Sequence, residues 1–186
     1  MRYIYEIGKQ LPKNIPAKIT CLFALLMCLY AVQEVSAQAV EPVVTATANI
    51  QPLQIGDHIP EELWHMPLQV VNHPDGKDTI TLNDYRGKLI ILDFWATWCG
   101  SCIAKMPKML ELQEKFSEEI QVILITKEEL AKALRFFSKN NFELTSVVHD
   151  EVFNRLFTHL SIPHYALINK EGIILAATSS DQITGD

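Results

Sequence analysis

Short, almost entirely apolar runs alternate with amphipathic segments through most of the chain. Residues 89–94 and 120–125 are nearly continuous apolar runs, which is typical of strands buried on both faces of a sheet. Between them, residues 99–116 carry apolar side chains at helical spacing. The pattern predicts a β-hairpin followed by β, α, β, α, β, α, β and β. The predicted segments are residues 68–71 with 79–82, 89–94, 99–116, 120–125, 128–139, 145–148, 152–160, 165–168 and 173–176.

The order of these elements predicts the class of fold. Strands that alternate with helices favour an α/β sheet with helices on both faces, here with an antiparallel hairpin at its end. The pair Asp75-Gly76 is typical of a tight turn between the first two strands. The sequence stops at Asp186, just where a further helix could begin, so we expect that last helix to be absent.

The first 39 residues have the pattern of a secretory signal peptide. Four basic residues precede the uncharged apolar run at residues 19–32, and small residues follow at 35–39. We expect cleavage after Ala37 or Ala39. Because a membrane span needs about 17–25 apolar residues, this run is short for a permanent anchor, although an uncleaved anchor stays an alternative. The predicted domains are a signal peptide (1–39), a linker (40–52) and one domain (53–186).

Composition and charge narrow the class of protein further. The chain has 186 residues, 48% of them hydrophobic, and a formal net charge of −6, which is ordinary for a globular domain. Cleavage would remove four basic and two acidic residues and leave a charge of −8. An acidic domain is a poor partner for nucleic acid, because phosphate binding needs clustered lysine and arginine. Cleavage would also remove Cys21 and Cys28 and leave Cys99 and Cys102.

The remaining cysteines lie in Trp98-Cys99-Gly100-Ser101-Cys102, between a predicted buried strand and a predicted helix. A structural disulfide with this spacing would close a very small loop and stabilise the fold little. A zinc site needs four ligands, and the cleaved chain has no second cysteine pair. A redox-active dithiol is therefore the favoured interpretation, with the other two kept as alternatives.

The position of the pair suits thiol chemistry. A helix N-terminus lowers the pKa of a cysteine, so we expect Cys99 to be the exposed nucleophile. Cys102 lies one helical turn later and could resolve a mixed disulfide, while Gly100 and Ser101 would tune the redox potential. Asp93 is an acid inside an apolar strand, and such burial is costly without a task or a partner. We expect it to accept the proton of Cys102; a buried acid satisfied by local hydrogen bonds is the alternative.

Residues 91–102, Ile-Leu-Asp-Phe-Trp-Ala-Thr-Trp-Cys-Gly-Ser-Cys, resemble the active-site segment of the thioredoxin superfamily. The preceding hairpin and the signal peptide resemble its exported branch, the TlpA-like thiol-disulfide oxidoreductases. The resemblance covers about residues 53–180 and includes Pro107 as the helix-kinking proline and Ile162-Pro163 as the cis-proline. It implies a thioredoxin-like α/β fold, with a central mixed sheet flanked by helices and an added N-terminal β-hairpin; the expected absence of the final C-terminal helix rests on where the sequence stops.

The resemblance also implies roles for single residues. Asp93 matches the buried acid of thioredoxins. Trp98 would form a wall of the substrate groove, Ile162 would contact an extended substrate segment, and Pro163 would shape the groove.

Two positions depart from the commonest family pattern. Ser101 replaces a frequent proline, which leaves the redox potential open, and His164 replaces a frequent threonine. A cationic His164 near Cys99 would favour the thiolate and raise oxidising power. The alternative is a histidine at the start of a strand that points elsewhere. Glu128 and Glu129 are most simply solvated charges.

These features together predict an exported thiol-disulfide oxidoreductase that exchanges disulfides with extracytoplasmic proteins. They favour a reductase over an oxidase. We expect it in the periplasm or otherwise outside the cytoplasm. The expected partners are protein disulfides or dithiols and a membrane electron donor or acceptor, with no nucleic acid. No metal or cofactor is expected beyond the Cys99–Cys102 disulfide. The alternatives are a peroxide-reducing thiol enzyme and a non-catalytic binding domain with a structural disulfide.

Overall fold

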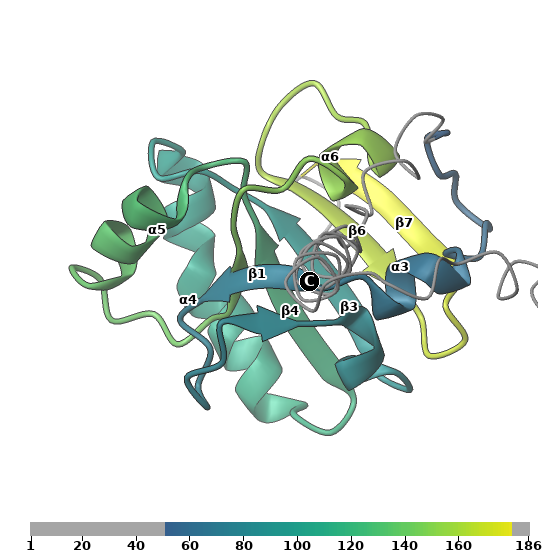
Figure 1. Ribbon diagram of the computed structural model, residues 1–186, viewed down its shortest axis with the longest axis horizontal. Helices are drawn as coiled ribbons and strands as arrows, with labels where there is room; N and C mark the ends of the chain where they lie inside the picture. The colour runs from purple at the N-terminus through teal and green to yellow at the C-terminus, as the bar shows by residue number, and fades with distance from the viewer. Residues whose placement is uncertain (1–50, 180–186) are drawn as a thin grey trace, which may run out of the picture. The chain divides into compact units, whose positions relative to one another are not determined.

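The computed structural model describes residues 51–179. The predicted signal peptide, its cleavage site, most of the linker and the expected absence of a final helix lie outside the described residues. The described part is a mixed sheet with helices packed against it (Figure 1). Its strands are β1 (Leu68–Val71), β2 (Thr79–Ile80), β3 (Leu89–Phe94), β4 (Ile120–Ile125), β5 (Ser146–Val147), β6 (His164–Ile168) and β7 (Ile174–Ser179). Its helices are α3 (Glu61–His65), the 3-10 turn η2 (Leu82–Tyr85), α4 (Gly100–Lys115), α5 (Leu130–Phe137) and α6 (Phe153–Leu156).

The seven strands lie in the order β2-β1-β5-β4-β3-β6-β7. The central strands β3, β4 and β5 are parallel to one another. The N-terminal pair β1 and β2 is antiparallel and joins the sheet through β5. On the other side, β6 pairs antiparallel with β3, and β7 pairs antiparallel with β6. The predicted mixed sheet, its added N-terminal hairpin and its closing hairpin are therefore confirmed.

The sheet separates two hydrophobic cores because successive side chains of a strand point to opposite faces. In β3, Ile90, Leu92 and Phe94 pack in the core that contains buried residues of α3 and α6. Ile91 packs in the other core, with α4 and α5. By the same alternation, the side chain of Asp93 faces the side of α4, the helix that begins beside the cysteine pair.

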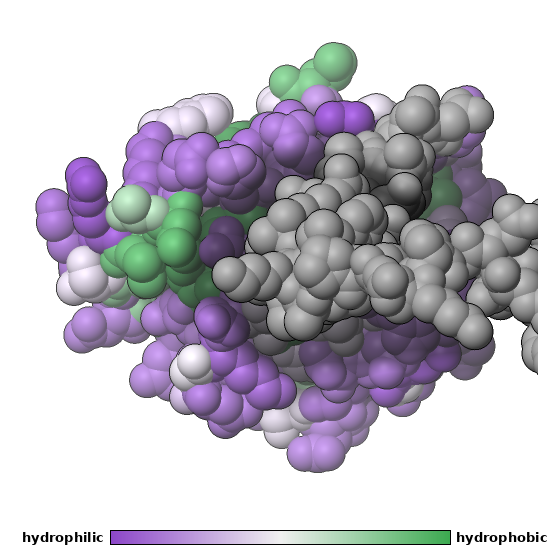
Figure 2. All heavy atoms as spheres, viewed as in Figure 1, coloured by the Kyte–Doolittle hydropathy of each residue, from purple (hydrophilic) through white to green (hydrophobic). Residues whose placement is uncertain are grey.

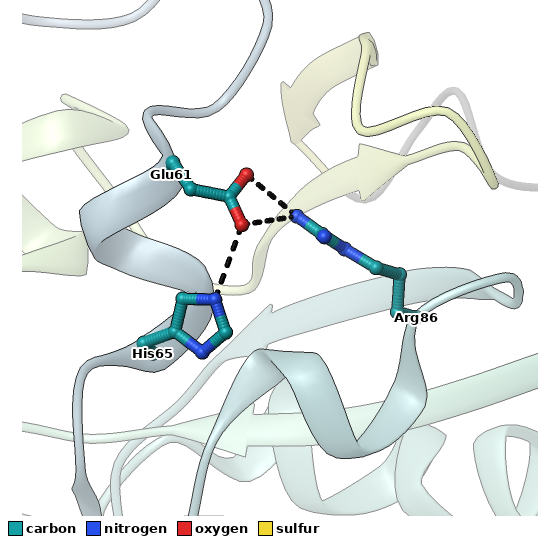
Figure 3. Close-up of polar contacts among 3 residues, drawn as sticks. All are labelled: Glu61, His65 and Arg86. Atoms are coloured by element: carbon teal, nitrogen blue, oxygen red, sulfur yellow. Dashed lines mark hydrogen bonds and ion pairs between the residues drawn. The ribbon is translucent and has the colours of Figure 1, made fainter.

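Helix α3 has no counterpart in the predicted elements, because five residues are too few to show a helical period. Polar contacts to Arg86, just after η2, fix its position (Figure 3). The Arg86 guanidinium donates to Oε1 and Oε2 of Glu61 at 2.9 and 2.7 Å and lies 4.4 Å from the ring centroid of Trp64. Hydrogen bonds from Arg86 hold the pKa of the exposed Glu61 below its usual value. On its buried side, Trp64 covers Gly172, whose φ of +83° favours glycine.

Helix α6 is much shorter than the predicted segment 152–160. The Asp150 carboxylate accepts hydrogen bonds from the backbone N–H groups of residues 152, 153 and 154, which starts the helix. The helix ends after Leu156, and the next apolar positions do not continue its buried face. Phe157 is buried but Leu160 is fully exposed, so the apolar pattern there overestimates the helix.

Candidate active site

The two cysteines form a disulfide at the N-terminus of α4. Cys99 is the N-cap residue, and its sulfur accepts a hydrogen bond from the backbone N–H of Cys102 at 3.2 Å. The two Cα atoms are 5.3 Å apart. The Oγ of Ser101 lies 3.5 Å from the Cys99 sulfur. The pair therefore lies where free N–H groups and a hydroxyl can stabilise negative charge on Cys99.

Both cysteines are buried in this disulfide form. Cys99 is only 4% exposed and Cys102 is 1% exposed, whereas the expectation of Cys99 as the exposed nucleophile concerns the reduced dithiol and stays a prediction. The reason for this burial is geometric: the Cys99 sulfur turns back over the first turn of α4 and caps it. The exposed residue of the motif is the preceding Trp98, which is 72% exposed.

Asp93 is a buried carboxyl on the face of the sheet that carries α4. It is 1% exposed, and its Oδ1 has no hydrogen-bond partner among the described residues. Burial raises its pKa to about 8, against a smaller opposing effect of the positive charge of Lys105 in α4. The Cys102 sulfur lies 4.0 Å from the backbone oxygen of Phe94, the residue next to Asp93. Asp93 is thus mostly protonated at pH 7 and lies in the strand that borders the cysteine pair.

A groove is lined by Trp98, the residue that precedes Cys99. Residues 94–96 and Trp98 form one wall, and the other wall comes from residues 159–162 in the loop between α6 and β6. Its volume is about 300 Å³. Trp98 and Ile162 both line it. Figure 2 shows a hydrophobic protrusion over this loop at the top of the view, consistent with the full exposure of Leu160.

The predicted cis-proline is present. The Ile162-Pro163 peptide bond is cis, and Pro163 is buried at the start of β6. Ile162 is half-buried and packs against both hydrophobic cores. The predicted substrate-binding residues Trp98 and Ile162 therefore share one groove, with Pro163 directly behind it.

His164 is not a cation beside Cys99. It pairs with Phe94 across β3 and β6, and its ring stacks on His159 at 4.8 Å between centroids, with Phe94 at 5.7 Å. The Phe94 side chain belongs to the core opposite α4. Burial, followed by the charge of His159, lowers the His164 pKa to about 4, so the ring is neutral at pH 7. The expectation of a cationic His164 is wrong, and the alternative of a strand-start histidine pointing elsewhere fits the structure.

Glu128 has a structural role that the sequence interpretation missed. Its carboxylate accepts hydrogen bonds from the backbone N–H and the Oγ1 of Thr97, at 2.8 and 3.0 Å, and pairs with Lys132. The side chain is 11% exposed, so it is not a solvated charge. Although burial alone would raise its pKa, the contacts with Lys132 and Thr97 lower it. Helix α5 consequently begins at Leu130 rather than at residue 128. The available signal was an acid just beyond the carboxyl end of a parallel strand, where sites of α/β sheets gather.

We expect the Glu128→Ala variant to be less stable than the wild type by about 1–3 kcal/mol, because it leaves the Thr97 N–H and hydroxyl without their acceptor. The free energy of unfolding in urea measures the effect. Glu118→Ala, at an exposed position, is the control and should change stability by less than about 0.5 kcal/mol. Equal changes in the two variants would show that the Thr97 contact does not hold this segment.

Comparison with known proteins identifies the family. Residues 55–177, which include the groove, the cysteine pair and the cis-proline, match the AhpC/TSA family. The chain belongs to this family. The resemblance to thiol-disulfide oxidoreductases of the thioredoxin superfamily is confirmed by its relatives and by solved structures of the same fold.

Three similar proteins illustrate the relationship. The thiol-disulfide oxidoreductase ResA of Bacillus thuringiensis subsp. konkukian is 32% identical over 119 residues, which are 62% of this chain and 68% of ResA. The thioredoxin-like protein YneN of Bacillus subtilis is 29% identical over 99 residues, which are 50% of this chain and 58% of YneN. The crystal structure of a putative thiol:disulfide interchange protein DsbE from Chlorobium tepidum superposes with a TM-score of 0.57 at 27% identity. That superposition covers 68% of this chain and 86% of the other.

Two further observations concern residues 51–179 only. No three histidine, cysteine, aspartate or glutamate side chains within that range are grouped so that they could hold a metal ion. None of the helices there has the length and apolar character needed to cross a membrane.

Proposed function

We propose that this member of the thiol-disulfide oxidoreductases exchanges disulfides with other extracytoplasmic proteins through Cys99 and Cys102, and that it works as a reductase. The observation that carries the proposal is the Cys99–Cys102 disulfide at the N-terminus of α4, preceded in the chain by Trp98 of the groove and by the buried Asp93 of β3. A thiolate at such a position is a nucleophile toward disulfides.

The proposed reaction starts from the reduced pair. The Cys99 thiolate attacks one sulfur of the substrate disulfide, forms a mixed disulfide and releases the other substrate sulfur as a thiolate. Cys102 then gives its proton to the ionised form of Asp93 and attacks the Cys99 sulfur. This step breaks the mixed disulfide, releases the second substrate thiolate and forms the Cys99–Cys102 disulfide. Two electrons pass from the enzyme dithiol to the substrate, and the protein ends in the form seen here.

The environment of Cys99 supports a reductase. A strong stabilisation of the reduced form makes a dithiol pair an oxidant, because reduction then becomes favourable. A cation beside Cys99 would provide such stabilisation, but His164, the residue expected in that role, is neutral at pH 7. The helix N-terminus and the Ser101 hydroxyl remain as weaker contributions, with Ser101 and Gly100 as the residues proposed to tune the potential.

The groove supports a protein substrate. Trp98 and the fully exposed Leu160 offer apolar surface on either side of it, and the backbone at Ile162 lies at its edge. We propose that an extended segment of the substrate lies here, against Trp98, Ile162 and Pro163. The basic and apolar N-terminal segment of the sequence supports export, with a membrane electron donor needed to restore the dithiol after each turnover.

A trapping experiment tests the proposal. In the full chain, Cys102→Ser should accumulate a mixed disulfide with a disulfide-bonded protein such as insulin, seen as a reducible adduct on a non-reducing gel. The double variant Cys99→Ser/Cys102→Ser is the matched control and should form none. Absence of any Cys99-dependent adduct would contradict the mechanism. If peroxide instead oxidised Cys99 much faster than a free thiol, the peroxide-reducing alternative would replace it.

The direction of transfer needs a separate measurement. Equilibration of the Cys99–Cys102 pair with glutathione gives its reduction potential. We expect a value at or below that of thioredoxin, about −270 mV. A value near that of strong oxidants, about −120 mV, would contradict the assignment as a reductase.

A further inference from the structure

Tyr165 lies directly opposite Asp93 in the antiparallel register of β6 and β3. Tyr165 and Asp93 are each 1% exposed. Tyr165 packs in the same core as Cys102 and α4, the side to which the Asp93 side chain also points. Directly opposed residues of antiparallel strands have Cβ atoms about 4.5–5.5 Å apart, so the two side chains leave the sheet side by side, and the charge of Asp93 acts on the Tyr165 hydroxyl.

Both side chains hold a polar atom with no protein partner. Among the described residues, the Tyr165 hydroxyl and Asp93 Oδ1 are two of three buried side-chain polar atoms that lack a hydrogen bond. The third, His164 Nε2, belongs to a ring on the other face of the sheet. Buried polar groups without partners are rare in folded proteins, and two on facing side chains indicate that they act on each other in some state of the protein.

The charges around Asp93 suit such an interaction. Burial, and then the charge of Asp93, raise the pKa of Tyr165, so its hydroxyl stays a proton donor across the working pH range. From α4, Lys105 and Cys102 are the other titratable groups on this side of Asp93. The β4 residue opposite Asp93 is the apolar Leu124. Tyr165 is therefore the neutral hydrogen-bond donor placed to respond when the carboxyl ionises.

We propose that Tyr165 is a positioning residue for Asp93, whose hydroxyl donates a hydrogen bond, directly or through one water molecule, to the carboxylate that takes the Cys102 proton. The role of this hydrogen bond in turnover rests on the proposed function. The hydrogen bond between Tyr165 and Asp93 does not depend on that function. In this step the S–H bond of Cys102 breaks and an O–H bond forms on Asp93, while the Tyr165 O–H bond stays intact. The hydrogen bond favours the ionised carboxyl and so readies Asp93 to accept.

Tyr165→Phe tests the proposal because it removes one oxygen and keeps the ring. The carboxyl ¹³C shift of Asp93, followed by NMR as a function of pH, reports the protonation of that one side chain in the oxidised protein. We expect the midpoint to rise by about one pH unit in the variant, since a donor to the charged form is lost. Resolution of a preformed mixed disulfide at pH 7 should slow by about tenfold, in line with that shift.

Matched variants make the result decisive. Tyr85→Phe removes a hydroxyl near His73, away from Asp93, and should leave the Asp93 midpoint unchanged. In an Asp93→Asn background, Tyr165→Phe should no longer change the pH dependence of resolution. An Asp93 midpoint that is the same with Tyr165 and with Phe at this position would overturn the proposal. The NMR titration stands even if the Cys102→Ser variant traps no substrate, so a failure of the proposed function and a failure of this inference are distinguishable.

Discussion

Replacing Cys99 with serine should lower the rate of disulfide reduction by at least about 1,000-fold, which corresponds to about 4 kcal/mol of lost transition-state stabilisation. A serine hydroxyl is not ionised near neutral pH and cannot form a mixed disulfide, so the first step of the proposed reaction has no substitute. The insulin reduction rate of the full chain, with a small dithiol as electron source, measures the loss.

The control for this variant is Ser117→Ala, at an exposed position beyond α4. Its rate should stay within about twofold of the wild type. Circular dichroism of both variants shows whether the fold persists, so that loss of activity is not confused with loss of structure. Retention of more than a tenth of the activity in Cys99→Ser would show that another group attacks the substrate.

The second large effect concerns stability. Asp93→Ala should raise the free energy of unfolding of the oxidised protein at pH 8 by about 3 kcal/mol. The folded-state pKa of Asp93 is about 8, whereas the ordinary value is 3.8, so folding favours the protonated form. The stability contributed by that protonated carboxyl is fully present below the ordinary pKa and is lost as the pH rises through 8. The whole shift would exceed 3 kcal/mol, but the smaller alanine leaves a cavity that offsets part of the gain.

Urea unfolding at pH 4 and at pH 8 tests the sign of this effect. The advantage of Asp93→Ala over the wild type should be small or reversed at pH 4 and should grow up to pH 8. Asp78→Ala, at an exposed carboxyl, serves as the control and should show no such growth. An Asp93→Ala difference that is constant between the two pH values would show that Asp93 is not a buried acid with a raised pKa. In the reduced protein, the same substitution should slow resolution by Cys102, because the proposed proton acceptor is gone.

Much of this architecture follows from local patterns. The bounds of β1, β3 and β4 agree with the apolar runs, because strands buried on both faces leave a continuous signal. The cysteine motif and the cis-proline are short segments that can be recognised from a few adjoining residues. Trp98 of the motif and Ile162 before Pro163 line one groove because β3 and β6 are neighbouring strands, an order that these short segments do not contain.

Other features could not be predicted because they depend on the register between distant strands. The contact of Glu128 with Thr97 joins residues 31 positions apart. The position of Glu128 just beyond a parallel strand marks a region where sites gather, but it does not indicate this partner. The side of the sheet to which His164 points depends on its pairing with Phe94, not on its position after Pro163. For the same reason, Tyr165 could be placed in a strand from the sequence but not opposite Asp93.

Asp93 and His164, on opposite faces of the sheet at β3, both have pKa values far from the ordinary ones. Asp93 loses its charge below a pH of about 8, and His164 gains one only below a pH of about 4. Across the interval between those values, the side chains of both Asp93 and His164 are uncharged in most of the population. Within that interval, these two side chains on opposite faces of β3 would thus add no charge to the sheet beside the cysteine pair while the acidity of the surroundings changes.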